Sequence, residues 1–247
     1  MKRLAALPVL AALLVTTGCG GDRAGAPKPA PTPAPTPAFT HVKSSSPRPH
    51  GRHLTARLTH PAHLRTAPGG RTLRHLAVRT EFGSATVLGV IGRRAGWLRV
   101  ITPRLPNHRS GWIPVRDARL DGTDYEIRVD RSAHRATLLH RRTAVLRFPV
   151  AVGRPGNETP LGRFAITDKL KPTDATSPYG CCALALSGHQ TKLEPGWPGG
   201  DRLAIHGTPA TWSIGQAVSL GCLRAPARAL RRLMRAVPLG TPVVIRA

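Results

Sequence analysis

The chain has 247 residues, enough for two compact units and a tail, and it carries a formal net charge of +25. Such a basic balance often marks a nucleic-acid-binding protein. Only 4% of the residues are aromatic and no nucleic-acid-binding motif is present, so we expect no nucleic acid as partner. The charge instead favours attraction to anionic polymers or to a membrane surface, and nothing indicates an obligate protein partner.

The N-terminus has the pattern of a secretory signal. Residues 1–3 are Met-Lys-Arg, residues 4–15 form an apolar run broken only by Pro8, and three small residues precede Cys19. The residues before Cys19 resemble a bacterial lipoprotein processing site. We therefore predict that residues 1–19 are a signal peptide with such a site and that Cys19 receives a lipid, with plain secretion as the alternative. In both cases the protein is expected outside the cytoplasm.

Residues 20–55 are predicted to be a proline-rich linker. Between residues 27 and 37, proline alternates with small residues, a pattern typical of extended polyproline II. Such a segment acts as a semi-rigid spacer, whereas binding to a proline-recognising partner is the alternative. As a spacer it would hold the folded part of the chain away from a membrane.

Residues 56–120 are predicted to form a small β-barrel. Glycine and proline turns separate short β-type runs at 63–69, 76–80, 85–90, 96–101 and 110–115. The paired units Gly96-Trp97 and Gly111-Trp112 resemble those of the bacterial SH3-like family. That resemblance implies a module that holds cell-wall glycan or peptide. The alternative is that the two tryptophans are core residues of a spacer domain.

Residues 123–247 are predicted to form a second, β-rich unit with one short helix near its end. Strands are expected at 125–129, 136–139, 144–152, 159–166, 203–205 and 241–245. Leu230, Leu233, Met234 and Val237 recur at helical spacing, so we expect residues 226–237 to form a helix whose apolar side faces the sheet. The fold class predicted for the whole chain is therefore mainly β.

Two reactive side chains, His206 and Cys222, lie in this second unit. The segment between them contains Pro209, Ser213 and Gly215, which favour a turning loop over one continuous helix. A thiol is a weak nucleophile near neutral pH, but a nearby imidazole can take its proton and return it to a leaving amine. The pair therefore indicates acyl transfer. A buried structural cysteine with an unrelated histidine is the alternative.

The residues around this pair resemble the L,D-transpeptidases with a YkuD-type catalytic domain. The matching stretches are His206-Gly207-Thr208, Ser219-Leu220-Gly221-Cys222-Leu223-Arg224 and Thr159-Pro160-Leu161-Gly162. One position departs from the family pattern, because Leu220 stands where many members carry a second histidine. Any contribution of that imidazole is therefore absent.

The resemblance implies an enzyme that forms 3-3 cross-links between peptidoglycan stem peptides. Cys222 would attack a stem peptide and release D-alanine, His206 would act as the base, and the carbonyl of Gly207 would orient the imidazole. No cofactor or metal is implied. Two alternatives remain: an L,D-carboxypeptidase, in which water replaces the acceptor amine, and a catalytically inactive scaffold that binds the cell wall.

The loop that carries the thiol is assigned further roles. Backbone N–H groups around Gly221 and Cys222 would form the oxyanion hole, with Ser219 in the same loop. Arg224 would bind a substrate carboxylate or pin the loop. We also expect the helix that begins just after Cys222 to lower the pKa of its thiol through the helix dipole.

In related enzymes, the region of residues 177–189 supplies a lid over the site. Tyr179 and His189 are therefore candidate substrate contacts, with a packing role for Tyr179 and a solvated loop position for His189 as alternatives. Cys181 and Cys182 are adjacent and could close only a strained ring, so we expect buried or free thiols. Their spacing with His189 does not favour a zinc site.

Overall fold

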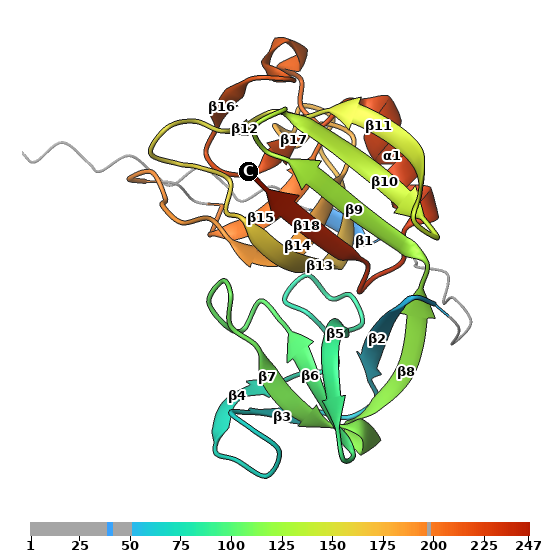
Figure 1. Ribbon diagram of the computed structural model, residues 1–247. Helices are drawn as coiled ribbons and strands as arrows, with labels where there is room; N and C mark the ends of the chain where they lie inside the picture. Colours follow the sequence, from blue (N-terminus) through green and yellow to red (C-terminus); the bar gives the residue numbers. More distant parts are fainter. Residues whose placement is uncertain (1–38, 42–50, 197–198) are drawn as a thin grey trace, which may run out of the picture. The chain divides into compact units, whose positions relative to one another are not determined.

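The computed structural model describes residues 39–41, 51–196 and 199–247 (Figure 1). The predicted signal peptide, the predicted lipidation site Cys19 and most of the predicted linker lie outside these residues. All described residues fall within one compact unit. Among them, no helix is long and apolar enough to cross a membrane.

The first part of the described chain folds into a seven-stranded antiparallel sheet, which we call the N-terminal sheet. Along the chain its strands are β2 (His53–Leu58), β3 (Ala62–Arg65), β4 (Thr72–Leu76), β5 (Val87–Arg94), β6 (Trp97–Ile101), β7 (Gly111–Pro114) and β8 (Ala118–Thr123), with a 3₁₀ turn, η1 (Val115–Asp117), before the last. Their order in the sheet is β4-β3-β7-β6-β5-β2-β8. Ala95 and Gly96 join β5 to β6 with positive φ, which suits a tight hairpin turn.

The core of the N-terminal sheet is aliphatic. Leu64 and Ile113 are fully buried in it, whereas Trp97 and Trp112 are only half-buried. The core of the sheet is therefore built from aliphatic side chains, and the two tryptophans are not part of it. The SH3-like identity of this part stays a prediction.

The N-terminal sheet differs from the predicted strands in two places. β2 and β8 form where no strand is predicted, and they pair with each other along their whole length. The strand predicted at 76–80 is wrong, because β4 ends at Leu76. The Thr80 and Glu81 side chains that follow bond with the second sheet, a long-range interaction that local alternation does not reveal.

The second part of the chain forms a nine-stranded sheet, which we call the C-terminal sheet. Along the chain its strands are β1 (Phe39–His41), β9 (Tyr125–Asp130), β10 (Arg135–His140), β11 (Thr143–Pro149), β13 (Gly162–Pro172), β14 (Ala183–His189), β15 (Arg202–His206), β17 (Leu223–Arg224) and β18 (Pro242–Arg246). Their order is β11-β10-β9-β18-β13-β14-β15-β17, with β1 paired to β13. A separate pair joins β12 (Val152–Gly153) to β16 (Ala217–Ser219). The prediction of a mainly β fold is confirmed.

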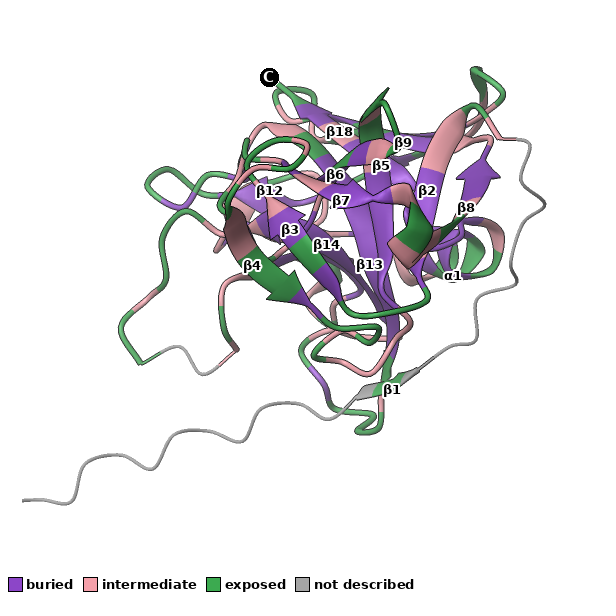
Figure 2. Ribbon diagram, turned by 90° about the horizontal axis from the view of Figure 1, so that it is seen from below, coloured by how far each residue is buried: buried purple, intermediate pink, exposed green. Residues whose placement is uncertain are grey.

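The single α-helix of the described chain, α1 (Ala227–Ala236), packs on the core of the C-terminal sheet. Leu230, Leu233 and Met234 are buried in that core, as the spacing of apolar residues predicts. Pro226 comes directly before the helix, where its missing N–H costs no intrahelical bond. Figure 2 shows the resulting burial, with β13 and β14 deeply covered and much of β4 exposed.

Two other segments of the C-terminal sheet differ from the predictions. Residues 39–41 of the predicted linker form β1, which pairs with residues 170–172 of β13 beyond the end of the β13–β18 ladder. Residues 183–189 of the predicted lid region form β14, a central strand of the sheet. The length of β13 explains both differences. The strand continues past Ala165 to Pro172, and this extension pairs with β14 and with β1.

A candidate active site around Cys222 and His206

The sheet brings the predicted thiol and imidazole to one place. His206 ends β15, and β17 lies beside it in parallel register, with His206 opposite Arg224. Cys222 comes directly before β17 and so reaches the same part of the sheet edge. Both side chains line one cavity of about 270 Å³. Other residues lining this cavity are Tyr179, Gln190, Arg202, Thr208, Pro209, Ser219, Leu220 and Arg224.

His206 is a buried, neutral base. Its Nδ1 lies 2.5 Å from the carbonyl oxygen of Gly207. A carbonyl only accepts hydrogen bonds, so Nδ1 carries the proton and Nε2 keeps a free lone pair. Burial, with a smaller contribution from the nearby Arg224 cation, lowers the pKa of His206 to about 4, against the opposing effect of the Gly207 bond.

The thiol of Cys222 is half-buried and protonated at rest. Its Sγ donates to the carbonyl oxygen of Arg202 at 3.7 Å. Burial raises the pKa of the thiol to about 11, which contradicts the expected lowering by the helix dipole. The reason is that α1 begins only at Ala227, five positions after Cys222. The cost of desolvating the thiolate therefore outweighs the effect of the helix dipole.

The loop of residues 219–222 is held by internal hydrogen bonds. Ser219 Oγ accepts from the Gly221 N–H at 3.1 Å and donates to the Cys222 carbonyl at 2.6 Å. Gly221 has a φ of 121°, which disfavours any residue with a Cβ. Because its N–H is bonded inside the loop, Gly221 does not offer the oxyanion donor that the resemblance implies. The role of Gly221 is to let the backbone of the loop adopt this conformation.

Thr159 is a site residue that the sequence motif contains but whose role was not recognised. Its hydroxyl is fully buried, donates to the Gly221 carbonyl at 2.8 Å and accepts from the Gly153 N–H at 2.9 Å. It thereby joins the nucleophile loop to β12. The match of Thr159-Pro160 to the family motif could have marked Thr159 as a site residue. Only the fold shows which groups its hydroxyl contacts.

Tyr179 and Arg224 both line the cavity, and their contacts with substrate stay predictions. The ring of Tyr179 meets that of His206 edge-to-face, with centroids 5.0 Å apart. Burial raises the pKa of Tyr179, and the charge of a Cys222 thiolate would raise it further. Arg224 places a cation at the cavity wall, and no ion pair among the described residues uses its guanidinium.

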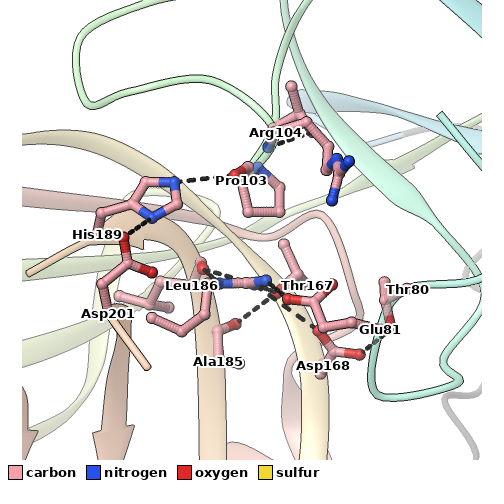
Figure 3. Close-up of polar contacts among 12 residues, drawn as sticks. Thr80, Glu81, Pro103, Arg104, Thr167, Asp168, Ala185, Leu186, His189 and Asp201 are labelled. Atoms are coloured by element: carbon pink, nitrogen blue, oxygen red, sulfur yellow. Dashed lines mark hydrogen bonds and ion pairs between the residues drawn. The ribbon is translucent and has the colours of Figure 1, made fainter. Parts of the chain in front are cut away.

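His189 does not belong to this cavity. Its Nδ1 lies 2.9 Å from Asp201 Oδ2, and its Nε2 lies 2.9 Å from the carbonyl oxygen of Pro103 (Figure 3). Both ring nitrogens are therefore used: Nδ1 contacts the residue before β15, and Nε2 joins β14 to a loop that follows β6 of the N-terminal sheet. His189 does not line the cavity, although the next residue, Gln190, and its ladder partner, Arg202, do, so the structure gives the predicted substrate contact through His189 no support.

Cys181 and Cys182 are free thiols, and Cys182 is buried. Their Sγ atoms lie 2.6 Å apart. The hydrogen bond from the Cys182 thiol, with a smaller effect of Arg231, lowers the pKa of Cys181 to about 7, while the pKa of Cys182 is raised. Within the described chain, no group of three metal-ligating side chains occurs, and His189 is bonded elsewhere.

A thiol and a neutral imidazole that face one cavity define a candidate thiol acyltransferase. A family model for the L,D-transpeptidase catalytic domain, YkuD, matches residues 124–245. A Bacillus subtilis strain 168 protein named as the L,D-transpeptidase YkuD is 33% identical over 181 residues, covering 71% of this chain and 94% of that protein. A Bacillus licheniformis protein of the same name is 34% identical over 125 residues, covering 51% of this chain and 67% of the relative.

Solved structures give a weaker likeness. An L,D-transpeptidase from Mycobacterium tuberculosis H37Rv aligns with a TM-score of 0.44 and 16% identity, covering 85% of this chain and 98% of that chain. The chain belongs to the L,D-transpeptidase family, whose members are acyltransferases, and the predicted resemblance is confirmed.

Proposed function

We propose that this protein is a peptidoglycan L,D-transpeptidase that forms 3-3 cross-links through a thioester on Cys222. The observation that carries the proposal is the placement of the Cys222 thiol and the His206 imidazole on one cavity, with Nδ1 of His206 bonded to the Gly207 carbonyl. Membership of the L,D-transpeptidase family supports stem peptides as the substrate class.

Acylation begins from two neutral groups. The thiol turns from the Arg202 carbonyl towards His206, and Nε2 takes its proton as Sγ attacks the carbonyl carbon of the third stem residue. The Gly207 carbonyl stabilises the imidazolium that forms. When the tetrahedral intermediate collapses, the bond to the terminal D-alanine breaks, and its amine leaves with the proton from Nε2.

Deacylation repeats the steps with a second stem peptide. The side-chain amine of its third residue gives a proton to Nε2 and attacks the thioester carbonyl. The new amide bond forms the 3-3 cross-link, and Cys222 leaves as a thiolate that recovers its proton from His206. The high pKa of the buried thiol makes the resting enzyme a thiol rather than a stored thiolate.

The remaining polar groups suit charge stabilisation and substrate binding. Since the Gly221 N–H is bonded to Ser219, the Cys222 N–H is assigned the main oxyanion contact. The Arg224 cation lines the cavity near His206 and suits a carboxylate of the stem peptide. Tyr179 forms an apolar wall for the substrate beside the imidazole.

We further propose that the enzyme is exported and held at the membrane by a lipid on Cys19, or else secreted. The proline-rich segment would place the described part of the chain at the cell wall. The net charge of +25 supports attraction to anionic wall polymers. The N-terminal sheet would act as an SH3-like module that binds the wall.

Incubation of the purified protein with tetrapeptide-containing muropeptides tests the activity, with products read by mass spectrometry. We expect a cross-linked dimer and loss of D-alanine with the wild type, and neither with Cys222→Ala. Tripeptide monomer as the sole product would indicate an L,D-carboxypeptidase. The absence of any product from the wild type would instead support an inactive wall-binding scaffold.

A further inference from the structure

β15 begins at Arg202, whose side chain is only 13% exposed. The ladder between β14 and β15 jumps from the pair Ala185–Ala204 to the pair His189–Arg202, so β14 bulges between them. A bulge leaves backbone groups outside the ladder. Here the Leu186 carbonyl accepts hydrogen bonds from Arg202 Nε and Nη2, at 3.1 and 2.8 Å. The guanidinium thus replaces the missing ladder bonds.

The same guanidinium also contacts two other segments. Its Nη2 donates to Thr167 Oγ1 of β13 at 2.6 Å, and its Nη1 pairs with Glu81, which lies between β4 and β5. The ring of Phe82 lies against it, with the centroid 5.7 Å from Cζ. Arg202 therefore joins the start of β15 to β13, to β14 and to a segment of the N-terminal sheet.

The buried carboxylate of Asp168 completes this network. Thr80 Oγ1 donates to its Oδ1 at 2.5 Å (Figure 3), and its Oδ2 lies 3.9 Å from Arg202 Nη2. That Oδ2 atom has no hydrogen-bond partner among the described residues. A buried ion pair of this kind adds little stability compared with packed apolar side chains. The network is therefore better explained by the geometry that it fixes than by stability.

The main chain of Arg202 contacts the nucleophile. Its carbonyl oxygen accepts the hydrogen bond of Cys222 Sγ, and both residues line the same cavity. The peptide group between Arg202 and Leu203 thus helps to set the resting direction of the thiol, together with a backbone contact of Ala204. Any shift of this peptide group moves the thiol relative to His206, four positions further along the same strand.

We propose that Arg202 is a positioning residue for Cys222, and that Glu81 of the N-terminal sheet is part of the same device. This proposal rests on the proposed function, in which Cys222 is the nucleophile. The guanidinium holds the start of β15 in place, and the Arg202 carbonyl then sets the resting position from which the thiol turns towards the imidazole. A misplacement of about 1 Å can cost on the order of a hundredfold in rate.

The test is the maximal rate at which a carbapenem acylates Cys222, followed by intact mass in the full chain. Glu81→Ala removes the partner of Nη1, and we expect the rate to fall on the order of tenfold. Glu81→Gln keeps an acceptor and should recover most of the loss. The lysine in Arg202→Lys cannot bond the Leu186 carbonyl and the Glu81 carboxylate at the same time, so the acylation rate of this variant should fall further. The carbapenem concentration at half-maximal rate should stay within about twofold, because binding is not the step affected.

Asp124→Ala is the matched control. Asp124 also holds an arginine, with Oδ2 3.0 Å from Arg141 Nε, but this pair lies outside the network and the cavity. It should leave the acylation rate unchanged. A merely structural role for Glu81 would lower the midpoint of thermal unfolding and leave the maximal rate of the folded protein intact.

A wild-type acylation rate in Glu81→Ala would overturn the proposal while leaving the proposed function in place. If Arg202→Lys does not fold, Glu81→Ala still decides, because the Glu81 side chain is 47% exposed and tolerates truncation. A wild type that forms no adduct would instead overturn the proposed function.

Discussion

The Nδ1 atom of His206 lies 2.5 Å from the carbonyl oxygen of Gly207, the next residue in the chain. This contact fixes the tautomer of the imidazole, so its other nitrogen can accept a proton from the thiol. Burial holds the imidazole and the thiol neutral together, with pKa values of about 4 and about 11. The resting site therefore differs from a thiolate–imidazolium pair.

The reactivity of Cys222 should rise with pH well into the alkaline range. With a pKa of about 11, the thiolate fraction grows about tenfold per unit of pH up to that value. The alkylation rate of Cys222 by iodoacetamide, followed by peptide mass, should show this slope. A plateau reached near neutral pH would mean that an ion pair already exists, and would contradict the neutral resting state.

Ser219→Ala should weaken both the nucleophile loop and the fold. The variant loses the bonds to the Gly221 N–H and the Cys222 carbonyl, which leaves buried groups unsatisfied at a cost of about 1–3 kcal/mol. We expect a lower free energy of unfolding in urea and a carbapenem acylation rate reduced on the order of tenfold.

Ser132→Ala is the control for that loss, since the Ser132 hydroxyl bonds Asp130 at an exposed turn. Its unfolding free energy should stay within about 0.5 kcal/mol of the wild type. Equal effects of the two substitutions would show that the bonds of Ser219 do not support the loop.

Cys181 should be the thiol that reacts fastest near neutral pH. Its pKa of about 7 follows mainly from the hydrogen bond of Cys182, with Arg231 contributing. Arg231→Gln should raise this pKa and slow the alkylation of Cys181, whereas Arg232→Gln, at the next exposed position of α1, should not. Peptide mapping after a short pulse of iodoacetamide measures each thiol. Preferential labelling of Cys222 at pH 7 would contradict this order.

Lys169 should make stability depend on alkaline pH. Burial lowers its pKa from 10.5 to about 8, and its Nζ bonds the Met234 carbonyl near the end of α1. Between these pH values the unfolded chain binds more protons than the folded one, so stability should rise from pH 8 to pH 10.5, by about 3 kcal/mol at most.

Lys169→Met should lose this rise, because the variant has no group there to titrate. Chemical denaturation at a series of pH values, with both proteins measured in parallel, cancels the contributions of other titrating groups. Parallel stability curves for the two proteins would show that Lys169 keeps an ordinary pKa in the fold.

Much of the C-terminal sheet could be predicted from local patterns. The strands around 125–140 alternate apolar and polar residues, and the turn at Arg141 and Arg142 adopts the positive φ values of a tight hairpin. The helix was predicted from the spacing of its leucines. These features depend on neighbouring residues, so one sequence is sufficient to predict them.

β14 could not be predicted in the same way. It is composed largely of alanine, serine, glycine and leucine, has weak β-propensity and is buried on both faces, so it shows no alternation. Its strand character comes from β13 and β15 on either side. The misplacement of His189 in the candidate site follows from this missed strand.

The positions of Cys222 and His206 in one cavity were anticipated from motif resemblance, but their pKa values were not. The expected effect of the helix dipole is local, whereas desolvation depends on everything packed around the thiol. Arg202 was missed for a similar reason. Its role appears only when Leu186, Thr167 and Glu81, from three separate segments, come together.

The proposed function requires that Cys222 is the residue that forms a covalent acyl-enzyme. The most direct measurement is the intact mass of the full chain after incubation with a carbapenem, with wild type and Cys222→Ala side by side. We predict a single adduct on the wild type, mapped to the peptide that contains Cys222, and none on the variant. An unmodified wild type, or an adduct that persists in Cys222→Ala, would contradict the account.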